Sequence, residues 1–110
     1  MQPLERVSDL DGVLDAPCAL IYKHSPICWQ STRAARQVEL FADAYPDVPV
    51  FVVDVVAHRD VSDRVAHRLR VVHESPQVIL VHGGAVEWSA SHHGVRHKAI
   101  AHAAAQCQTV

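Results

Sequence analysis

Apolar and polar positions change their spacing along this chain, and the changes divide it into predicted strands and helices. Three short segments are almost continuously apolar, which is typical of strands buried in a sheet. They cover residues 18–23, 50–55 and 77–81. A fourth predicted strand, residues 85–89, follows the turn signal His82-Gly83-Gly84 and would return as a hairpin partner of 77–81.

Apolar residues at helical spacing mark four other segments as helices. The first covers residues 9–15. The second begins near Cys28 and ends before Pro46, because proline disfavours helical backbone in the residue before it. Ser62 is predicted to cap the third helix, and the fourth covers about residues 95–105.

The predicted order is helix, strand, helix, strand, helix, strand, strand, helix. A βαβ unit with parallel strands and a right-handed crossover is followed by a ββα unit, which is the plan of the thioredoxin fold. The sequence therefore predicts an α/β fold of thioredoxin-like type, with a central four-stranded mixed sheet flanked by helices. We find no repeat or linker, so residues 1–110 are predicted to form a single domain.

Composition narrows the possible partners. The net charge is −2 and no basic block is present, which argues against nucleic-acid binding. The longest apolar run, residues 48–57, contains Pro49 and Asp54 and is far shorter than the roughly 20 residues of a membrane span. The first ten residues lack the pattern of a secretory signal. We expect a cytoplasmic monomer with no nucleic-acid or membrane partner.

Cys28 lies where the strand 18–23 gives way to the second helix. Unpaired N–H groups and the dipole at a helix N-terminus favour the thiolate, which is the reactive form of cysteine. Ser31 stands one turn later, where a two-cysteine redox motif has its resolving thiol. A serine can donate a hydrogen bond to the thiolate but cannot form a disulfide, so an external thiol would have to resolve a mixed disulfide. The alternative is a small buried cysteine at a helix start.

A second motif, HESPQ at residues 73–77, precedes the third strand. Pro76 stands just before that strand, where its missing N–H matters least. Thioredoxin-fold proteins place a cis-proline at this position, facing the active cysteine. The residue before it, here Ser75, offers backbone groups to an incoming disulfide. The alternative is a proline that merely opens a strand.

The other cysteines and the histidines give weaker signals. Cys18 opens a predicted strand and should pack in the core. Cys107 should pack at a helix end or lie exposed, and the alternative is a distant resolving thiol if the C-terminal tail folds back. Three cysteines do not make a disulfide framework, so we expect reduced thiols. His93 and His97 have a spacing that can share a helix face, but no metal motif accompanies them. No metal site is predicted.

Three sequence blocks, KHSPICWQS, HESPQ and SHH, together resemble the monothiol bacilliredoxins, a thioredoxin-like family of the bacillithiol system. The blocks occur in the family's order with fitting spacing, and the resemblance runs from about Leu4 to His102. The family usually has proline and isoleucine after the cysteine, whereas this chain has Trp29 and Gln30. Trp29 can form an apolar lip for a substrate, or narrow the site and change which thiol is accepted.

The resemblance implies a reaction. The Cys28 thiolate would attack a mixed disulfide between bacillithiol and a protein, take the bacillithiol onto itself, and release the protein as a thiol. A second bacillithiol would regenerate Cys28. Ser75 and Pro76 would align the disulfide, Ser31 would stabilise the thiolate, and His24 would handle protons. Bacillithiol is then a co-substrate rather than a tightly bound cofactor, and bacillithiolated proteins are the partners.

Two other functions share this fold and stay open. One is a binding module that holds an iron–sulfur cluster between two copies, as some monothiol glutaredoxins do with glutathione, although no glutathione-family signature is present. The other is a non-catalytic adaptor in which Cys28 is inert and a groove beside Pro76 binds a peptide.

Overall fold

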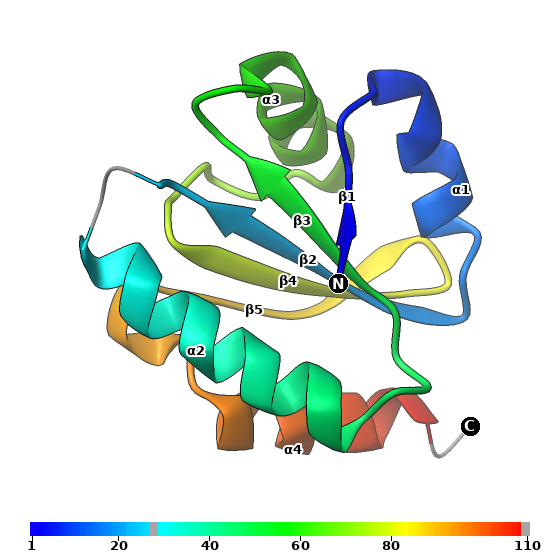
Figure 1. Ribbon diagram of the computed structural model, residues 1–110. Helices are drawn as coiled ribbons and strands as arrows, with labels where there is room; N and C mark the ends of the chain where they lie inside the picture. The colour runs from blue at the N-terminus through cyan, green and yellow to red at the C-terminus, as the bar shows by residue number, and fades with distance from the viewer. Residues whose placement is uncertain (27–28, 109–110) are drawn as a thin grey trace.

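The structure is a computed structural model that describes residues 1–26 and 29–108, without the side chains of Gln30 and Gln108. Over these residues the chain forms a five-stranded mixed sheet with helices on both faces (Figure 1). The strand order is β1-β3-β2-β4-β5, in which β1 pairs with β3 and β3 with β2 in parallel, whereas the β2–β4 and β4–β5 pairs are antiparallel. The strands are β1 (Gln2–Pro3), β2 (Cys18–His24), β3 (Val50–Asp54), β4 (Gln77–His82) and β5 (Ala85–Ser91).

The thioredoxin-like prediction is confirmed, and β1 is an addition to the four predicted strands. Two residues are too few to give a periodic pattern, so the sequence did not mark this strand. Its position comes from pairing with β3, which continues where the Leu4 N–H donates to the Val52 carbonyl at 2.8 Å. The first residues of the chain are thereby attached to the edge of the sheet.

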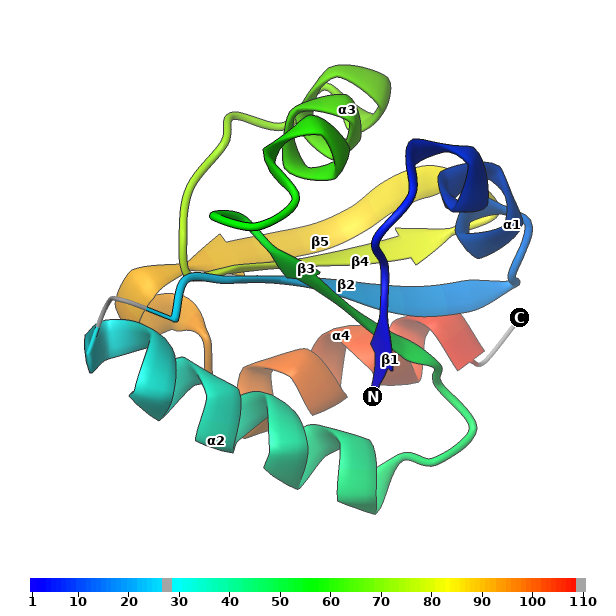
Figure 2. The ribbon, with the colours of Figure 1, turned by 45° about the horizontal axis from the view of Figure 1, so that its top comes forward.

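Helices cover both faces of the sheet, as Figure 2 shows. The helices α1 and α3 lie on one face, and α2 and α4 lie on the other. None of the helices in the described part of the chain is long and apolar enough to cross a membrane. The helices are α1 (Leu10–Leu14), α2 (Trp29–Ala44), α3 (Arg59–Leu69) and α4 (His97–Gln108), and short 3-10 turns, Val7–Asp9 and His92–Gly94, precede α1 and α4.

The third helix begins earlier than the sequence predicted. α3 starts at Arg59, so Ser62 is buried inside the helix and does not cap it. The cause is Asp54 at the end of β3, whose carboxylate accepts the N–H groups of Val56 and Ala57, both at 2.9 Å. This side-chain turn directs the backbone into the helix before Ser62 is reached.

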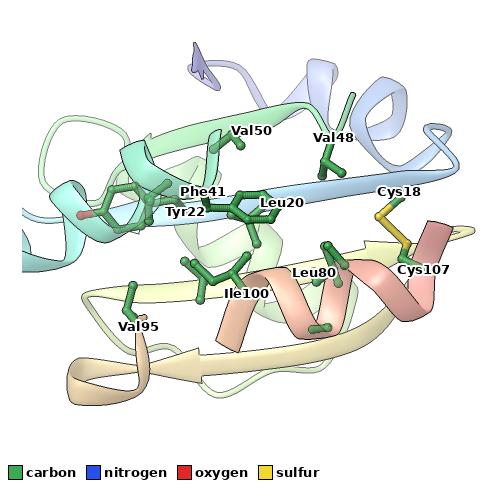
Figure 3. Packing of buried hydrophobic residues seen from close by; sticks show 14 of the residues in the cluster. Cys18, Leu20, Tyr22, Phe41, Val48, Val50, Leu80, Val95, Ile100 and Cys107 are labelled. Carbon is green, nitrogen blue, oxygen red and sulfur yellow. A yellow bond between two sulfur atoms is a disulfide. The ribbon is translucent and has the colours of Figure 1, made fainter. Parts of the chain in front are cut away.

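The central strand β2 contributes to two separate cores. Leu20 and Tyr22 join the core under α2 and α4 (Figure 3), whereas Ala19 and Ile21 join the core under α1 and α3. Because side chains alternate along a strand, the two residues that end β2, a lysine and a histidine, also point to opposite faces.

A disulfide joins Cys18 to Cys107 (Figure 3), which corrects the prediction of reduced thiols. Cys18 opens β2 and Cys107 lies near the end of α4, with their Cα atoms 6.1 Å apart. Both residues are buried, as expected of packing cysteines. An odd number of cysteines does not show which two will meet, and these are 89 positions apart. The bond fastens α4 to the central strand.

Candidate functional site

The described residues of the predicted site lie together where β2 ends and β4 begins. This edge of the sheet is formed by the ends of the strands and not by an outer strand. Cys28 lies outside the described residues, immediately before Trp29 opens α2. Lys23 of β2 is paired with Gln77 of β4, which places the Ser75–Pro76 segment beside the end of β2. Helix α2 starts beside the same edge, as Figure 1 shows.

Tyr22 organises the α2 side of this edge. Its hydroxyl donates to the Ser31 carbonyl at 3.1 Å and lies 2.9 Å from His24 Nδ1. Burial, assisted by the charge of Glu39, raises the pKa of Tyr22, so the hydroxyl keeps its proton at neutral pH. Because the hydroxyl donates its only proton to the Ser31 carbonyl, His24 Nδ1 is the donor in the contact with the tyrosine oxygen. Nε2 is then the nitrogen of His24 that can accept a proton.

Ser31 is completely buried in the first turn of α2. Its Oγ accepts the N–H of Ser25 at 3.3 Å, which ties the start of α2 to the segment after β2. Because Oγ acts as the acceptor in this bond, the hydroxyl proton stays available for donation. A hydrogen bond from Ser31 to the Cys28 thiolate remains a prediction.

Lys23 and His73 form a network that the sequence analysis did not find. The Lys23 side chain is fully buried, and its Nζ lies 3.1 Å from His73 Nδ1; the Oγ of Ser62 lies 3.3 Å from the same nitrogen. Burial lowers the pKa of Lys23 to about 8, although the charge of Asp63 opposes the shift. Burial and the charge of Lys23 lower the pKa of His73. At pH 7 a charged lysine therefore donates to a neutral imidazole.

The buried charge on Lys23 should make stability depend on pH. The pKa of Lys23 is about 8 in the folded chain and 10.5 in an unfolded chain, so between these values only the unfolded chain holds the proton. The free energy of unfolding should therefore rise across this interval, by up to about 3 kcal/mol from this residue. Urea unfolding of the wild type and of Lys23→Met, each at about pH 7 and about pH 10, tests this pH dependence. The variant should be the more stable at about pH 7, and its advantage should shrink by about pH 10; a constant difference would contradict the prediction.

The Ser75–Pro76 peptide bond is cis. Buried Gln77 holds the loop before it from inside, because its side chain donates to the Val72 carbonyl at 3.0 Å and accepts the Glu74 N–H at 3.3 Å. The Oγ of Ser75 is buried and has no hydrogen-bond partner within the described residues. A buried hydroxyl in this position suits a polar group brought by a ligand.

The SHH block supplies backbone groups to the same edge. The His92 N–H donates to the Pro76 carbonyl at 2.9 Å, and the Arg33 guanidinium on α2 donates to the His92 carbonyl at 2.9 Å. The block therefore links the cis-proline to α2. His93 and His97, whose spacing would allow a shared helix face, do not share one, because His93 precedes α4 and His97 opens it. Within the described residues, no three His, Cys, Asp or Glu residues gather as metal ligands.

Exposed apolar side chains border this edge. Trp29, which was predicted to contact substrate, is 74% exposed at the start of α2. Val56 follows β3 and Val72 precedes β4, and they are 56% and 81% exposed. Exposed apolar residues around a candidate site suit contact with a partner.

Comparison with known proteins decides the family. The model of the family described as monothiol bacilliredoxin BrxC matches residues 2–100. The chain belongs to the monothiol bacilliredoxin family. Bacilliredoxin-type thiol redox function follows from this membership, and it agrees with the resemblance found in the sequence.

Solved structures agree on the fold of this bacilliredoxin. A candidate oxidoreductase with a thioredoxin fold is 27% identical, with a TM-score of 0.87 over 94% of this chain and 92% of that one. Thioredoxin from Fasciola hepatica is 16% identical, with a TM-score of 0.80 over 98% and 100% of the two chains. Mitochondrial thioredoxin 3 from Saccharomyces cerevisiae is also 16% identical, with a TM-score of 0.76 over 93% and 91%. The two thioredoxins show likeness of fold alone.

Proposed function

We propose that this bacilliredoxin is a monothiol thiol–disulfide oxidoreductase that removes bacillithiol from protein mixed disulfides through Cys28. The observation that carries the proposal is the family match over residues 2–100. The chain has serine at position 31, one helical turn after Cys28, so no second thiol occupies the place of a resolving cysteine. Cytoplasmic bacillithiolated proteins would be its substrates. The protein would act on them as a monomer.

The reaction consists of two thiol–disulfide exchanges. In the first, the Cys28 thiolate attacks the bacillithiol sulfur of the mixed disulfide; a new S–S bond forms, the old one breaks, and the target protein leaves as a thiolate that takes a proton. In the second, a bacillithiol thiolate attacks the bacillithiol sulfur on Cys28. Cys28 is released as a thiolate, and the oxidised bacillithiol dimer leaves.

The surrounding residues have distinct roles in this proposal. Ser31 would donate its hydroxyl proton to the Cys28 thiolate, which the helix N-terminus also stabilises. His24, whose Nδ1 is occupied by Tyr22, would pass protons through Nε2. Ser75 and Pro76 would align the incoming disulfide, and the exposed ring of Trp29 would contact the target protein.

The test uses a model protein that carries one cysteine as a bacillithiol mixed disulfide. After mixing, intact-mass spectra of both partners should show bacillithiol on Cys28 and the model protein as a free thiol. Transfer from a glutathione mixed disulfide only would preserve the thiol chemistry and overturn the bacillithiol assignment. If neither disulfide reacts, the adaptor or the cluster-binding module replaces this proposal, and a brown preparation with cluster absorption would select the latter.

A further inference from the structure

We propose that Lys23 is a positioning residue for thiol transfer, which acts through His73 to hold the Ser75–Pro76 loop against the end of β2. The inference rests on the proposed function and assigns a task to a side chain that the reaction does not touch.

A fully buried lysine is an unfavourable choice for the fold alone. Lys23 occupies the α3 side of β2, where its strand neighbours Ala19 and Ile21 belong to an apolar core. An apolar side chain of similar length would fill this place without losing the hydration of an ammonium group. Buried charges that persist despite this cost are concentrated at functional sites.

The bond from Lys23 reaches the loop that carries the cis-proline. Its ammonium lies 3.1 Å from His73 Nδ1, and Ser62 of α3 lies 3.3 Å from the same atom. His73 is thus held from β2 and from α3, two residues before Ser75. It begins the loop segment that the side chain of Gln77 also secures.

The pair holds a positive lysine and a neutral histidine at pH 7. Burial, the charge of Lys23 and the charge of Arg59 on α3 lower the pKa of His73, whereas Asp63 on α3 and Glu74 in the loop favour its charged form. Asp63 likewise favours the ammonium form of Lys23. An ammonium group that donates to a neutral imidazole forms a charge-assisted hydrogen bond, which is stronger than a neutral one.

The bond between Lys23 and His73 would help to align the incoming disulfide with Cys28. In the proposed reaction the loop presents a disulfide to Cys28, and displacement of a positioning group by about 1 Å can lower a rate a hundredfold. Alkylation of Cys28 by iodoacetamide needs no such alignment. The two reactions therefore separate a positioning role from a general loss of structure.

The experiment compares the wild type with Lys23→Met and with His73→Ala. We expect both variants to lower kcat/KM for transfer from the bacillithiol-modified model protein by about tenfold, with alkylation of Cys28 changed less than about twofold. His73→Asn should recover most of the activity, because the asparagine oxygen can accept the bond in place of Nδ1. Lys98→Met removes an exposed lysine from α4 and serves as the matched control, with an unchanged rate.

Hydrogen exchange at the Glu74 amide, which is bonded to Gln77, gives a readout that does not depend on activity. Faster exchange in Lys23→Met than in Lys98→Met would support the inference even if the wild type failed to transfer bacillithiol, a failure that would overturn only the proposed function. Unchanged exchange would overturn the inference. Wild-type transfer rates in a folded Lys23→Met would also overturn it.

Discussion

Replacing Cys28 with serine should reduce bacillithiol transfer to the uncatalysed background, a loss of roughly 10³-fold or more. A serine hydroxyl is not ionised at neutral pH and cannot form a disulfide, so both exchanges of the proposed reaction lose their nucleophile. The measurement is the release of the free thiol of the model protein, followed by mass in the presence of excess bacillithiol.

The matched controls for this substitution are Cys18→Ser and Cys107→Ser. Both residues are buried at the opposite end of β2 from His24, so each variant should retain transfer at 25 °C provided that it remains folded. Activity that survived in Cys28→Ser but vanished in either control would move the reactive sulfur to the disulfide pair and contradict the proposal.

Breaking the disulfide should have the largest effect on stability. The bond joins residues 89 positions apart, and closing so long a loop restricts the unfolded chain strongly. We expect Cys107→Ala to lower the free energy of unfolding by about 2–5 kcal/mol, as measured by urea denaturation without reductant.

Reductant supplies the internal control for that prediction. A dithiol reductant should lower the urea midpoint of the wild type towards that of Cys107→Ala and leave the variant unchanged. Equal midpoints of the oxidised wild type and the variant would show that the bond contributes nothing to stability.

The fold could be predicted because its elements carry strong local patterns. The apolar runs that became β2, β3 and β4 end within a residue or so of the predicted limits, and the Gly-Gly turn located the hairpin. The exceptions depend on contacts between distant residues. β1 exists only because β3 pairs with it, and the start of α3 is set by the side chain of Asp54.

The roles of Ser31, Ser75 and Pro76 stay predictions. Their place at one end of the sheet could be predicted, because their motifs lie next to the ends of strands. The partnership of Lys23 with His73 could not, because the two are 50 positions apart and nothing in a strand pattern shows what a lysine will meet. The disulfide could not be predicted either, because its two cysteines are also far apart in the sequence.

The opposite orientations of Lys23 and His24 also restrict how the sequence can change. Lys23 bonds the loop at His73 on one face, while His24 meets Tyr22 on the other. Inserting or deleting a single residue within β2 would exchange the faces of every later position in the strand. It would direct the histidine toward α3 and the lysine toward α2 in one step. Homologues should therefore vary in length in their loops and keep β2 at a constant length up to the segment that holds Cys28.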